Sequence, residues 1–268
     1  MRYFSSHFLM LILLMLTLST NHGVAQTNSS VAPPSINDLF EYKEVLTYEV
    51  KYGFLRLGEV EVTMMPDSMF RGQMHKHLVT KIVSNPKIPF IGTEIDHFHS
   101  LFLVNDDGLP ITSYYWKDNI DEEIYKDIEY DFDREKNWVT YKEEDLTRDT
   151  LDLEEPATAG HVIFLFSRMF AGTDFENSMI VYVTKRKGYI HFNNSTELEK
   201  RNYKPWEEPV QTYLTTGNTE NIDGPFGFSG KFRAWFLNDE LRIPLEARVK
   251  VLFGNALVRL IDYKKERL

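Results

Sequence analysis

The sequence predicts a mainly β protein, in which one large antiparallel sheet curves into an incomplete barrel and a single helix lies inside it or across its mouth. Apolar and polar residues alternate with a period of two along most of the chain, which is typical of strands that bury one face. Short turn-forming segments separate these runs. One apolar segment breaks the alternation and follows helical spacing instead.

The alternation is clear at both ends of the chain. Leu46, Tyr48, Val50 and Tyr52 share one face of a first strand, with polar residues between them. Further alternating runs cover residues 124–132, 228–236, 245–253 and 257–263. About a dozen strands fit into the chain, a number that suits one curved antiparallel sheet or a barrel. The face opposite the core carries acidic and basic residues, so we expect water rather than lipid outside it.

Residues 158–171 are predicted to form the one helix. Val162, Leu165 and Met169 follow helical spacing, and Gly172 stands where a helix C-cap is expected. The other sides of this helix are also apolar, so most of its faces must be covered. The concave side of a curved sheet would provide that cover.

Residues 1–25 have the features of a secretory signal peptide. Arg2 precedes an apolar run from Phe8 to Leu18, and small residues follow it. The run is about 11 residues long, whereas a membrane-spanning helix needs roughly 20, so we expect cleavage before Gln26 rather than anchoring.

The remaining chain is predicted to contain a flexible tether, residues 26–38, and a single β domain, residues 39–268. The tether is polar and contains proline. No glycine-, serine- or proline-rich linker divides the sequence after Leu39, which favours one domain.

The composition limits the partners and the compartment. The formal net charge is −10, and removing the signal peptide leaves 29 basic and 40 acidic residues, a net charge of −11. Such a chain repels the phosphates of nucleic acid and anionic headgroups, so no nucleic-acid partner is predicted. The chain contains no cysteine, which excludes disulfides, thiolate metal sites and lipid attachment to an N-terminal cysteine. Because no later apolar run is long enough to span a bilayer, the mature protein is expected in the periplasm or outside the cell.

Two His-x-His pairs are candidate metal ligands. His75 and His77, and likewise His97 and His99, would each point to one side of a strand and could supply two imidazoles to zinc. If the two strands are antiparallel neighbours, the four rings could converge. The alternative is that these histidines lie on a solvated strand face. No other cofactor is predicted, because the acid-rich segments lack calcium-loop spacing and no hydrolase motif occurs.

The segment from Tyr52 to Val62 contains two glycines and one arginine. Gly53 and Gly58 predict a bulge or bend that lets the first long strand curl into the barrel. Arg56 would face solvent if the bend points outward, or contact an acidic ligand group at the rim if it points inward.

Four segments, taken together, resemble the bacterial exported proteins grouped as domain of unknown function 3108. The segments are residues 46–62, 107–116, 161–169 and 231–263. One departure is His161, at a helix entry where that family tends to have aspartate. The resemblance implies an envelope protein without an established activity, so it assigns no catalytic residues. The C-terminal segment is also similar to lipoprotein-carrier folds, in which an incomplete barrel wraps a helix and holds acyl chains.

Two functional hypotheses follow. In the first, the protein is a non-enzymatic binding module whose concave face holds an acyl chain, another apolar ligand or an envelope protein. The alternative is that the apolar side chains of the concave face only fill the core and bind no ligand. In the second, the protein is a metal-dependent hydrolase that uses the two histidine pairs.

Overall fold

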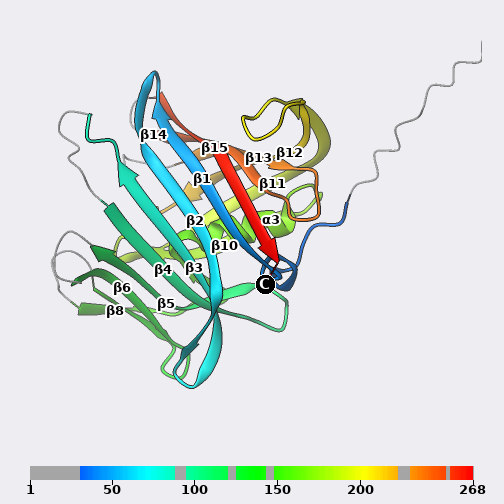
Figure 1. The fold of residues 1–268 in the computed structure, drawn as a ribbon. Coiled ribbons are helices and arrows are strands. Elements are labelled where there is room, and N and C mark those ends of the chain that lie inside the picture. The colour runs from blue at the N-terminus through cyan, green and yellow to red at the C-terminus, as the bar shows by residue number, and fades with distance from the viewer. Residues whose placement is uncertain are drawn as a thin grey trace, which may run out of the picture. The chain divides into compact units, whose positions relative to one another are not determined.

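One sheet contains all fifteen strands of the described chain (Figure 1). The computed structural model describes residues 31–87, 95–119, 125–142, 148–222, 230–251 and 254–267. The expected signal peptide and the first part of the expected tether lie outside these residues. The strands are β1 (Tyr42–Tyr52), β2 (Leu55–Phe70), β3 (Gln73–Ser84), β4 (Ile95–Val104), β5 (Pro110–Asn119), β6 (Tyr125–Asp133), β7 (Trp138–Lys142), β8 (Arg148–Asp152), β9 (Ala157–Ala159), β10 (Glu176–Val183), β11 (Arg186–Arg201), β12 (Val210–Glu220), β13 (Lys231–Leu237), β14 (Pro244–Val251) and β15 (Gly254–Arg267).

The sheet is a meander in which strands adjacent in sequence pair with each other, except β8 and β9, which are its two edges. Its order is β8-β7-β6-β5-β4-β3-β2-β1-β15-β14-β13-β12-β11-β10-β9. The first and last strands, β1 and β15, pair in its middle, which joins the two ends of the described chain. The pairing is antiparallel except between β9 and β10, which are parallel. The prediction of a mainly β fold with one curved antiparallel sheet is therefore confirmed.

The sheet curves strongly but does not close. Its two edge strands are β8 and β9. The edge strand β9 approaches β5 instead of β8, and the backbone N–H of Ala159 donates to Thr112 Oγ1 at 3.0 Å. Strands β6 to β8 therefore extend past the point of contact, which leaves an incomplete barrel.

The helix is shorter than the predicted 158–171. Residues 157–159 form β9, a 3₁₀ turn η1 follows (Gly160–Val162), and only Ile163–Phe170 is the α-helix α3. Thr158 is fixed in the sheet because its hydroxyl donates to the carbonyl of Ile180 at 2.8 Å. Gly160 has a φ of +64°, whereas residues within an α-helix have a φ of about −63°. Pairing with β10 therefore overrides the helical pattern of the first residues.

The folded structure also begins earlier than predicted. A short helix, α2 (Ile36–Leu39), lies within the expected tether, and Ile36 and Leu39 are buried in the core. Ser35 and Asp38 form a capping box: the Ser35 N–H donates to Asp38 Oδ2 at 2.7 Å, and Ser35 Oγ accepts from the Asp38 N–H at 3.3 Å. The sequence pattern missed this helix because it is only one turn long.

The glycines near the start of the sheet have different roles. Gly53 is not a bend within a strand: β1 ends at Tyr52, and Gly53, with a φ of +58°, belongs to the hairpin turn to β2. Gly58 does mark the predicted bulge, since the register between β1 and β2 shifts opposite it. A Cβ at Gly58 would lie 2.3 Å from the carbonyl oxygen of Val83, so a side chain there would disrupt the pairing with β3.

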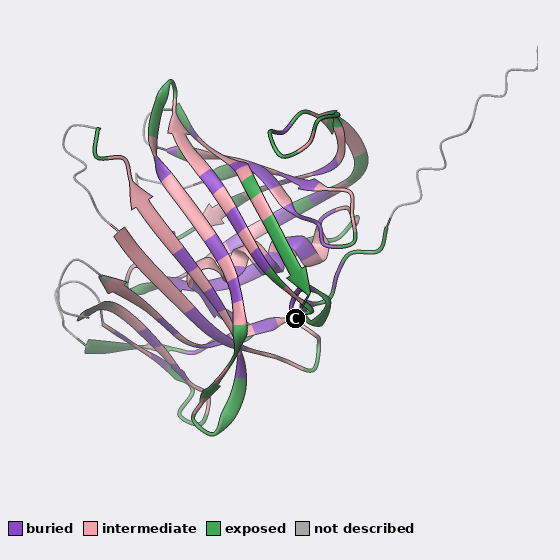
Figure 2. Cartoon of the chain, viewed as in Figure 1, coloured by how far each residue is buried: buried purple, intermediate pink, exposed green. Residues whose placement is uncertain are grey.

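The core lies on the concave face of the sheet, called here the inner face. Figure 2 shows buried residues concentrated on α3 and along the strands, whereas the end of β15 is exposed. Residues of β1, β2 and β14 pack with α2 and α3 in one cluster, which includes Tyr48, Val62, Leu165 and Leu245. Residues of β5 to β7 pack against β9 and β10 in another.

Candidate functional site

A buried ion pair joins α3 to β1. Arg168 Nη1 donates to Glu44 Oε2 at 2.8 Å, and the two side chains are 1% and 0% exposed. Arg168 Nε donates to the carbonyl of Leu241 at 2.7 Å, and the Tyr263 hydroxyl donates to Glu44 Oε1 at 2.7 Å. Burial, together with the charge of Glu44, raises the pKa of Tyr263. These bonds link the helix to three separate parts of the chain.

A second buried arginine holds the C-terminal end of α3. Arg242 Nε donates to the carbonyl of Ala171 at 3.0 Å, and its guanidinium lies 4.6 Å from the centroid of the Tyr213 ring. Its other nitrogens donate to the carbonyls of Asp239 and Val31. Burial lowers the pKa of Arg242. Because the last carbonyls of a helix lack intrahelical partners, a cation there stabilises the helix end.

An apolar cavity of about 220 Å³ lies between α3 and the inner face of the sheet. Ile163, Phe164 and Ser167 of the helix line one side of it. The sheet side consists mainly of apolar residues of β13, β14 and their neighbours. Ala234 and Ala247 lie there directly opposite each other on β13 and β14, so two short side chains leave space beneath the helix.

The polar side chains around this cavity already have hydrogen-bond partners. The Tyr48 hydroxyl donates to the carbonyl of Pro244 at 2.9 Å, and Ser167 Oγ donates within α3 to the carbonyl of Ile163 at 2.7 Å. Thr215 Oγ1 donates to Asn194 Oδ1 at 2.7 Å. The cavity therefore suits an apolar group and provides little to orient a polar one.

The structure brings two of the four candidate histidines together. His77 Nε2 and His99 Nδ1 are 3.1 Å apart, on the face of β3 and β4 opposite the core. Ser68 Oγ lies 3.2 Å from His77 Nδ1, and Asp118 Oδ2 lies 3.5 Å from His99 Nε2. Trp116 stacks on His99 with ring centroids 4.5 Å apart. Burial, and next the charge of His99, lower the pKa of His77 to about 4.

The other two histidines have separate environments. His75 is buried, and its ring lies 3.0 Å from the carbonyl of Gln73 and 2.9 Å from Ser113 Oγ. The expectation of a solvated face is therefore wrong for His75. His97 lies two residues before His99 on β4 and pairs across the strands with Lys81. Burial, and next the charge of Lys81, lower the pKa of His97.

This arrangement differs from a metal centre. Among the described residues, no group of three or more histidine, aspartate or glutamate side chains is placed to hold a metal ion. The nitrogens of His77 and His99 already face Ser68, each other and Asp118. A metal ligand needs a ring nitrogen whose lone pair is directed at the ion. These contacts of His77 and His99 would therefore have to break before either ring could bind a metal ion.

Arg56, the candidate rim residue, lies on the surface at the start of β2. Its guanidinium contacts Glu59, and both side chains are well exposed. The backbone carbonyl of Arg56 accepts a hydrogen bond from Asn85 Nδ2 at 2.7 Å. In this structure Arg56 therefore has an acidic partner from its own strand.

Sequence reasoning missed the ion pair that positions the helix. Glu44 is two residues before Leu46 and therefore on the buried face of the first strand, and Arg168 is the charged residue of a mainly apolar helix. A charged residue at a core-facing position of each element is a signal for a buried pair. The cavity itself has no comparable signal, because it depends on which alanines face each other across two strands.

Comparisons with known proteins support the fold and not an activity. One solved structure, a beta-barrel-like protein of domain of unknown function 1849 from Brucella abortus, matches with a TM-score of 0.54 and 10% identity, over 84% of this chain and 98% of that one. A protein with a YmcC-like fold from Bacteroides fragilis matches with a TM-score of 0.39 and 8% identity, over 83% and 95%. No family model and no curated protein matches, so the resemblance to domain of unknown function 3108 is not confirmed.

Among the described residues, no helix is long and apolar enough to cross a bilayer.

Proposed function

We propose that the protein is an exported, non-enzymatic protein of the cell envelope that binds an apolar ligand, an acyl chain, between α3 and the inner face of the sheet. The observation that carries this proposal is the cavity of about 220 Å³, whose lining is apolar and whose polar neighbours are already hydrogen-bonded. Export is supported by the apolar run from Phe8 to Leu18, with Arg2 before it.

The size of the cavity limits the ligand. Sites for small molecules usually measure about 300–1,000 Å³, so 220 Å³ accommodates one segment of a chain and not a complete two-chain lipid. Burying hydrocarbon stabilises the complex by about 25 cal/mol per Å² of apolar surface. Longer chains would need α3 to move, which the Glu44–Arg168 ion pair opposes. A chain of limited length, with its head group outside, satisfies both limits.

Native mass spectrometry of the protein purified from its own envelope tests this proposal. We expect an adduct with the mass of a lipid or fatty acid in the wild type. In the double variant Ala234→Leu and Ala247→Leu the added side chains fill the cavity, so the adduct should disappear. Ala32→Leu is the matched control, because Ala32 is exposed and outside the cavity.

The same measurement distinguishes the competing enzyme hypothesis. Zinc bound in a one-to-one ratio, and lost when His97→Ala and His99→Ala are combined, would replace the proposal with a metal-dependent hydrolase. An adduct that persists unchanged in the cavity-filled variant would place the ligand elsewhere on the protein. A wild type free of any lipid adduct would contradict acyl-chain binding.

A further inference from the structure

Four exposed cations form a compact group on the outer face of β13 and β14. They are Lys231 and Arg233 of β13, and Arg248 and Lys250 of β14. Along both strands these residues alternate with apolar residues that line the inner cavity. Because successive side chains of a strand point to opposite faces, the cations lie on the side of the sheet away from α3.

The strand register places these cations against one another. Arg233 is directly opposite Arg248, and the pairing continues to Phe232 and Val249, one residue before Lys231 and Lys250. Like charges directly opposite each other destabilise a pair of strands, whereas opposite charges stabilise it. The Arg233–Arg248 pair, with a lysine two residues further along each strand, therefore costs stability in the free protein, and an anion bound among these cations would remove that cost.

The cations line a groove in which none of the described lining residues is acidic. Its volume is about 690 Å³, and the other polar side chains of its described lining are uncharged: Asn193, Thr216, Asn218 and Asn255. This composition is notable in a chain with a formal net charge of −10. Amide and hydroxyl groups beside four cations suit an anion with several oxygen atoms, since they add hydrogen-bond donors at its edges.

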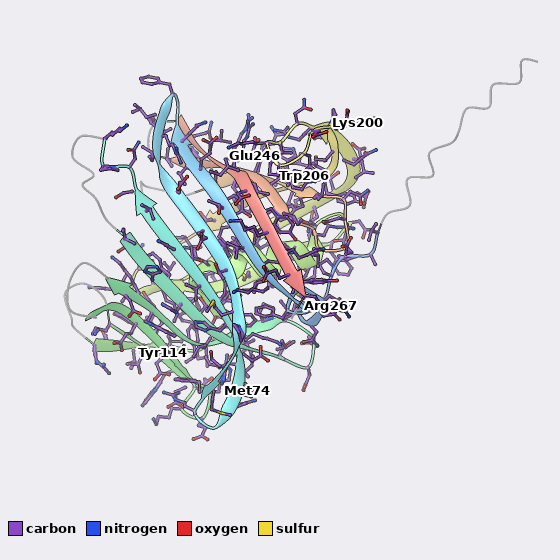
Figure 3. All side chains as sticks on the ribbon, viewed as in Figure 1. Met74, Tyr114, Lys200, Trp206, Glu246 and Arg267 are labelled. Carbon is purple, nitrogen blue, oxygen red and sulfur yellow. The ribbon has the colours of Figure 1, made fainter. Side chains whose placement is uncertain are left out.

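A buried glutamate holds one of the arginines in place. Glu246, which is labelled in Figure 3, is fully buried on β14. Arg248 Nε donates to its Oε1 at 2.9 Å. Arg201 donates to the same carboxylate at 3.0 Å and Arg259 at 2.7 Å. Burial opposes the charge of Glu246, but the hydrogen bonds of Arg259 and Arg248 still lower its pKa. One carboxylate thus meets three guanidiniums.

An aromatic ring restrains both groove arginines. The Trp235 ring lies 5.1 Å from the Arg233 guanidinium and 5.5 Å from that of Arg248, measured to the ring centroid. Its Nε1 donates to Glu199 Oε2 at 3.1 Å, which fixes the ring. Guanidiniums packed on an aromatic ring lose less freedom when they bind a ligand, which favours binding.

We propose that this groove binds a small molecule that carries a diphosphate or two closely spaced phosphate groups. Neighbouring strands are about 4.8 Å apart and alternate residues of a strand about 6.7 Å, so the four cations surround an area about as large as two adjacent phosphates. Arginine pairs with phosphate through two parallel hydrogen bonds. The concave shape favours a discrete ligand over a flat membrane surface. The groove lies on the opposite face from the acyl-chain cavity, so this proposal does not depend on that function.

Isothermal titration calorimetry with inorganic pyrophosphate at an ionic strength of about 0.1 M tests the site in the full-length mature protein. We expect binding to the wild type, and at least tenfold weaker binding to the double variant Lys231→Gln and Lys250→Gln. The control is Lys43→Gln with Lys204→Gln, which removes two exposed lysines outside the groove. Its affinity should remain within about twofold of the wild type, because charged groups beyond about 10 Å are screened by salt. An equal loss of pyrophosphate affinity in the groove variant and in the control would overturn the proposal.

Thermal unfolding separates loss of the site from loss of the fold. Without pyrophosphate, the groove variant should be at least as stable as the wild type, since removing two of the four clustered cations reduces the repulsion between them. With pyrophosphate, the midpoint should rise for the wild type and the control but not for the groove variant. A destabilised groove variant would contradict the argument from repulsion.

Vesicles of an anionic phospholipid provide the last comparison. The proposal predicts that soluble pyrophosphate binds and competes with any adsorption to such vesicles. Adsorption to vesicles without measurable binding of pyrophosphate would mean that the cations form a membrane-facing patch, and the proposal of a discrete phosphate site would be wrong.

Discussion

The two halves of the sheet bury their inner faces in different ways. On β5 to β7, aromatic residues such as Tyr115 and Tyr130 pack directly against Ala157 and Ala159 of β9, which are fully buried. On β13 and β14, the inner face packs against the helix α3, and a cavity of about 220 Å³ remains between them. Alanines are present at both contacts, yet only the contact with β9 is closely packed, and the contact with α3 contains a cavity.

The difference comes from the element that covers the sheet. An edge strand with small residues lies flat and close, and a Cβ at Gly160 would stand only 2.1 Å from the Tyr115 ring. A helix is a cylinder about 10 Å wide that touches a concave sheet along a narrow line. Short residues on the sheet, Ala234 and Ala247, then do not reach it. Small residues therefore produce close contact beneath a strand and space beneath a helix.

The largest effect is expected from releasing the helix on the cavity side. Arg168→Met should lower the free energy of unfolding by about 3–5 kcal/mol, because Glu44 would remain buried without its cation. Urea denaturation of the purified protein measures this loss. The double variant Glu44→Gln and Arg168→Met removes both charges and should recover part of it. A single variant within 1 kcal/mol of the wild type would show that the ion pair does not position α3.

The close contact on the filled side is tested by Gly160→Ala. We expect a loss of about 3 kcal/mol, from a φ of +64° that disfavours alanine and from the collision with Tyr115. Gly53→Ala is the control for the backbone, since Gly53 has a φ of +58° and no atom near its Cβ position. The control should lose only about 1–2 kcal/mol in the same urea titration. If Gly160→Ala and Gly53→Ala lower the free energy of unfolding equally, Tyr115 can move away from the added methyl group.

A matched pair of substitutions compares the two contacts directly. Ala157→Leu should lower the free energy of unfolding by about 1–3 kcal/mol, because that contact is already filled. Ala247 lines the cavity, so the larger side chain of Ala247→Leu has space there, and the free energy of unfolding should change by less than about 1 kcal/mol. Thermal unfolding of both variants measures the difference. If Ala247→Leu costs as much as Ala157→Leu, the two halves do not differ in packing.

The outer faces of the two halves should also respond differently to pH, since one carries the His77–His99 pair and the other a group of arginines. The pKa of His77 is about 4 in the folded protein and near 6.5 when unfolded, so the unfolded chain binds more protons between these values. Stability from this residue is present above pH 6.5 and is lost as the pH falls to 4. We expect a loss on the order of 1 kcal/mol, because His77 is partly exposed to solvent.

His77→Gln removes this titration and is the variant to compare. Its free energy of unfolding, measured by urea denaturation from pH 7 to pH 4, should fall less steeply than that of the wild type. Parallel curves for the two proteins would assign the pH dependence to other groups.

The smallest effect is expected at Arg56. Its ion pair with Glu59 is exposed, and exposed pairs contribute about 0–1 kcal/mol. Arg56→Gln should change the unfolding midpoint in urea by an amount equal to less than about 0.5 kcal/mol, and it should leave the lipid adduct unchanged. Loss of the adduct would instead make Arg56 part of the ligand site.

The histidine pairs illustrate how far the sequence predicts a site. Their spacing correctly indicates that each pair lies on one face, opposite the core residues Leu78 and Phe102. Whether the rings meet depends on the register of β3 and β4, which pairs His77 with Leu101 and Val79 with His99. Only the diagonal pair, His77 and His99, comes into contact. Spacing along one strand carries no information about register between two.

Local sequence patterns likewise predicted part of the fold but not all of it. Alternation of apolar and polar residues predicted one curved antiparallel sheet, because the period of two specifies which residues are buried wherever a strand forms. The same reasoning placed the helix too early, since Ala157 to Ala159 suit a strand or a helix equally well. Their parallel pairing with β10 decided the outcome.

The sequence by itself determined the class of fold and the charge and composition of both faces, because these depend on residue type and on the period of a single strand. The tertiary structure decided that β1 pairs with β15, that Glu44 meets Arg168, that a cavity remains beneath α3, and that four cations face each other on β13 and β14. Each of these depends on residues far apart in the chain, whose pairing is set by register and by packing of the whole sheet rather than by local sequence.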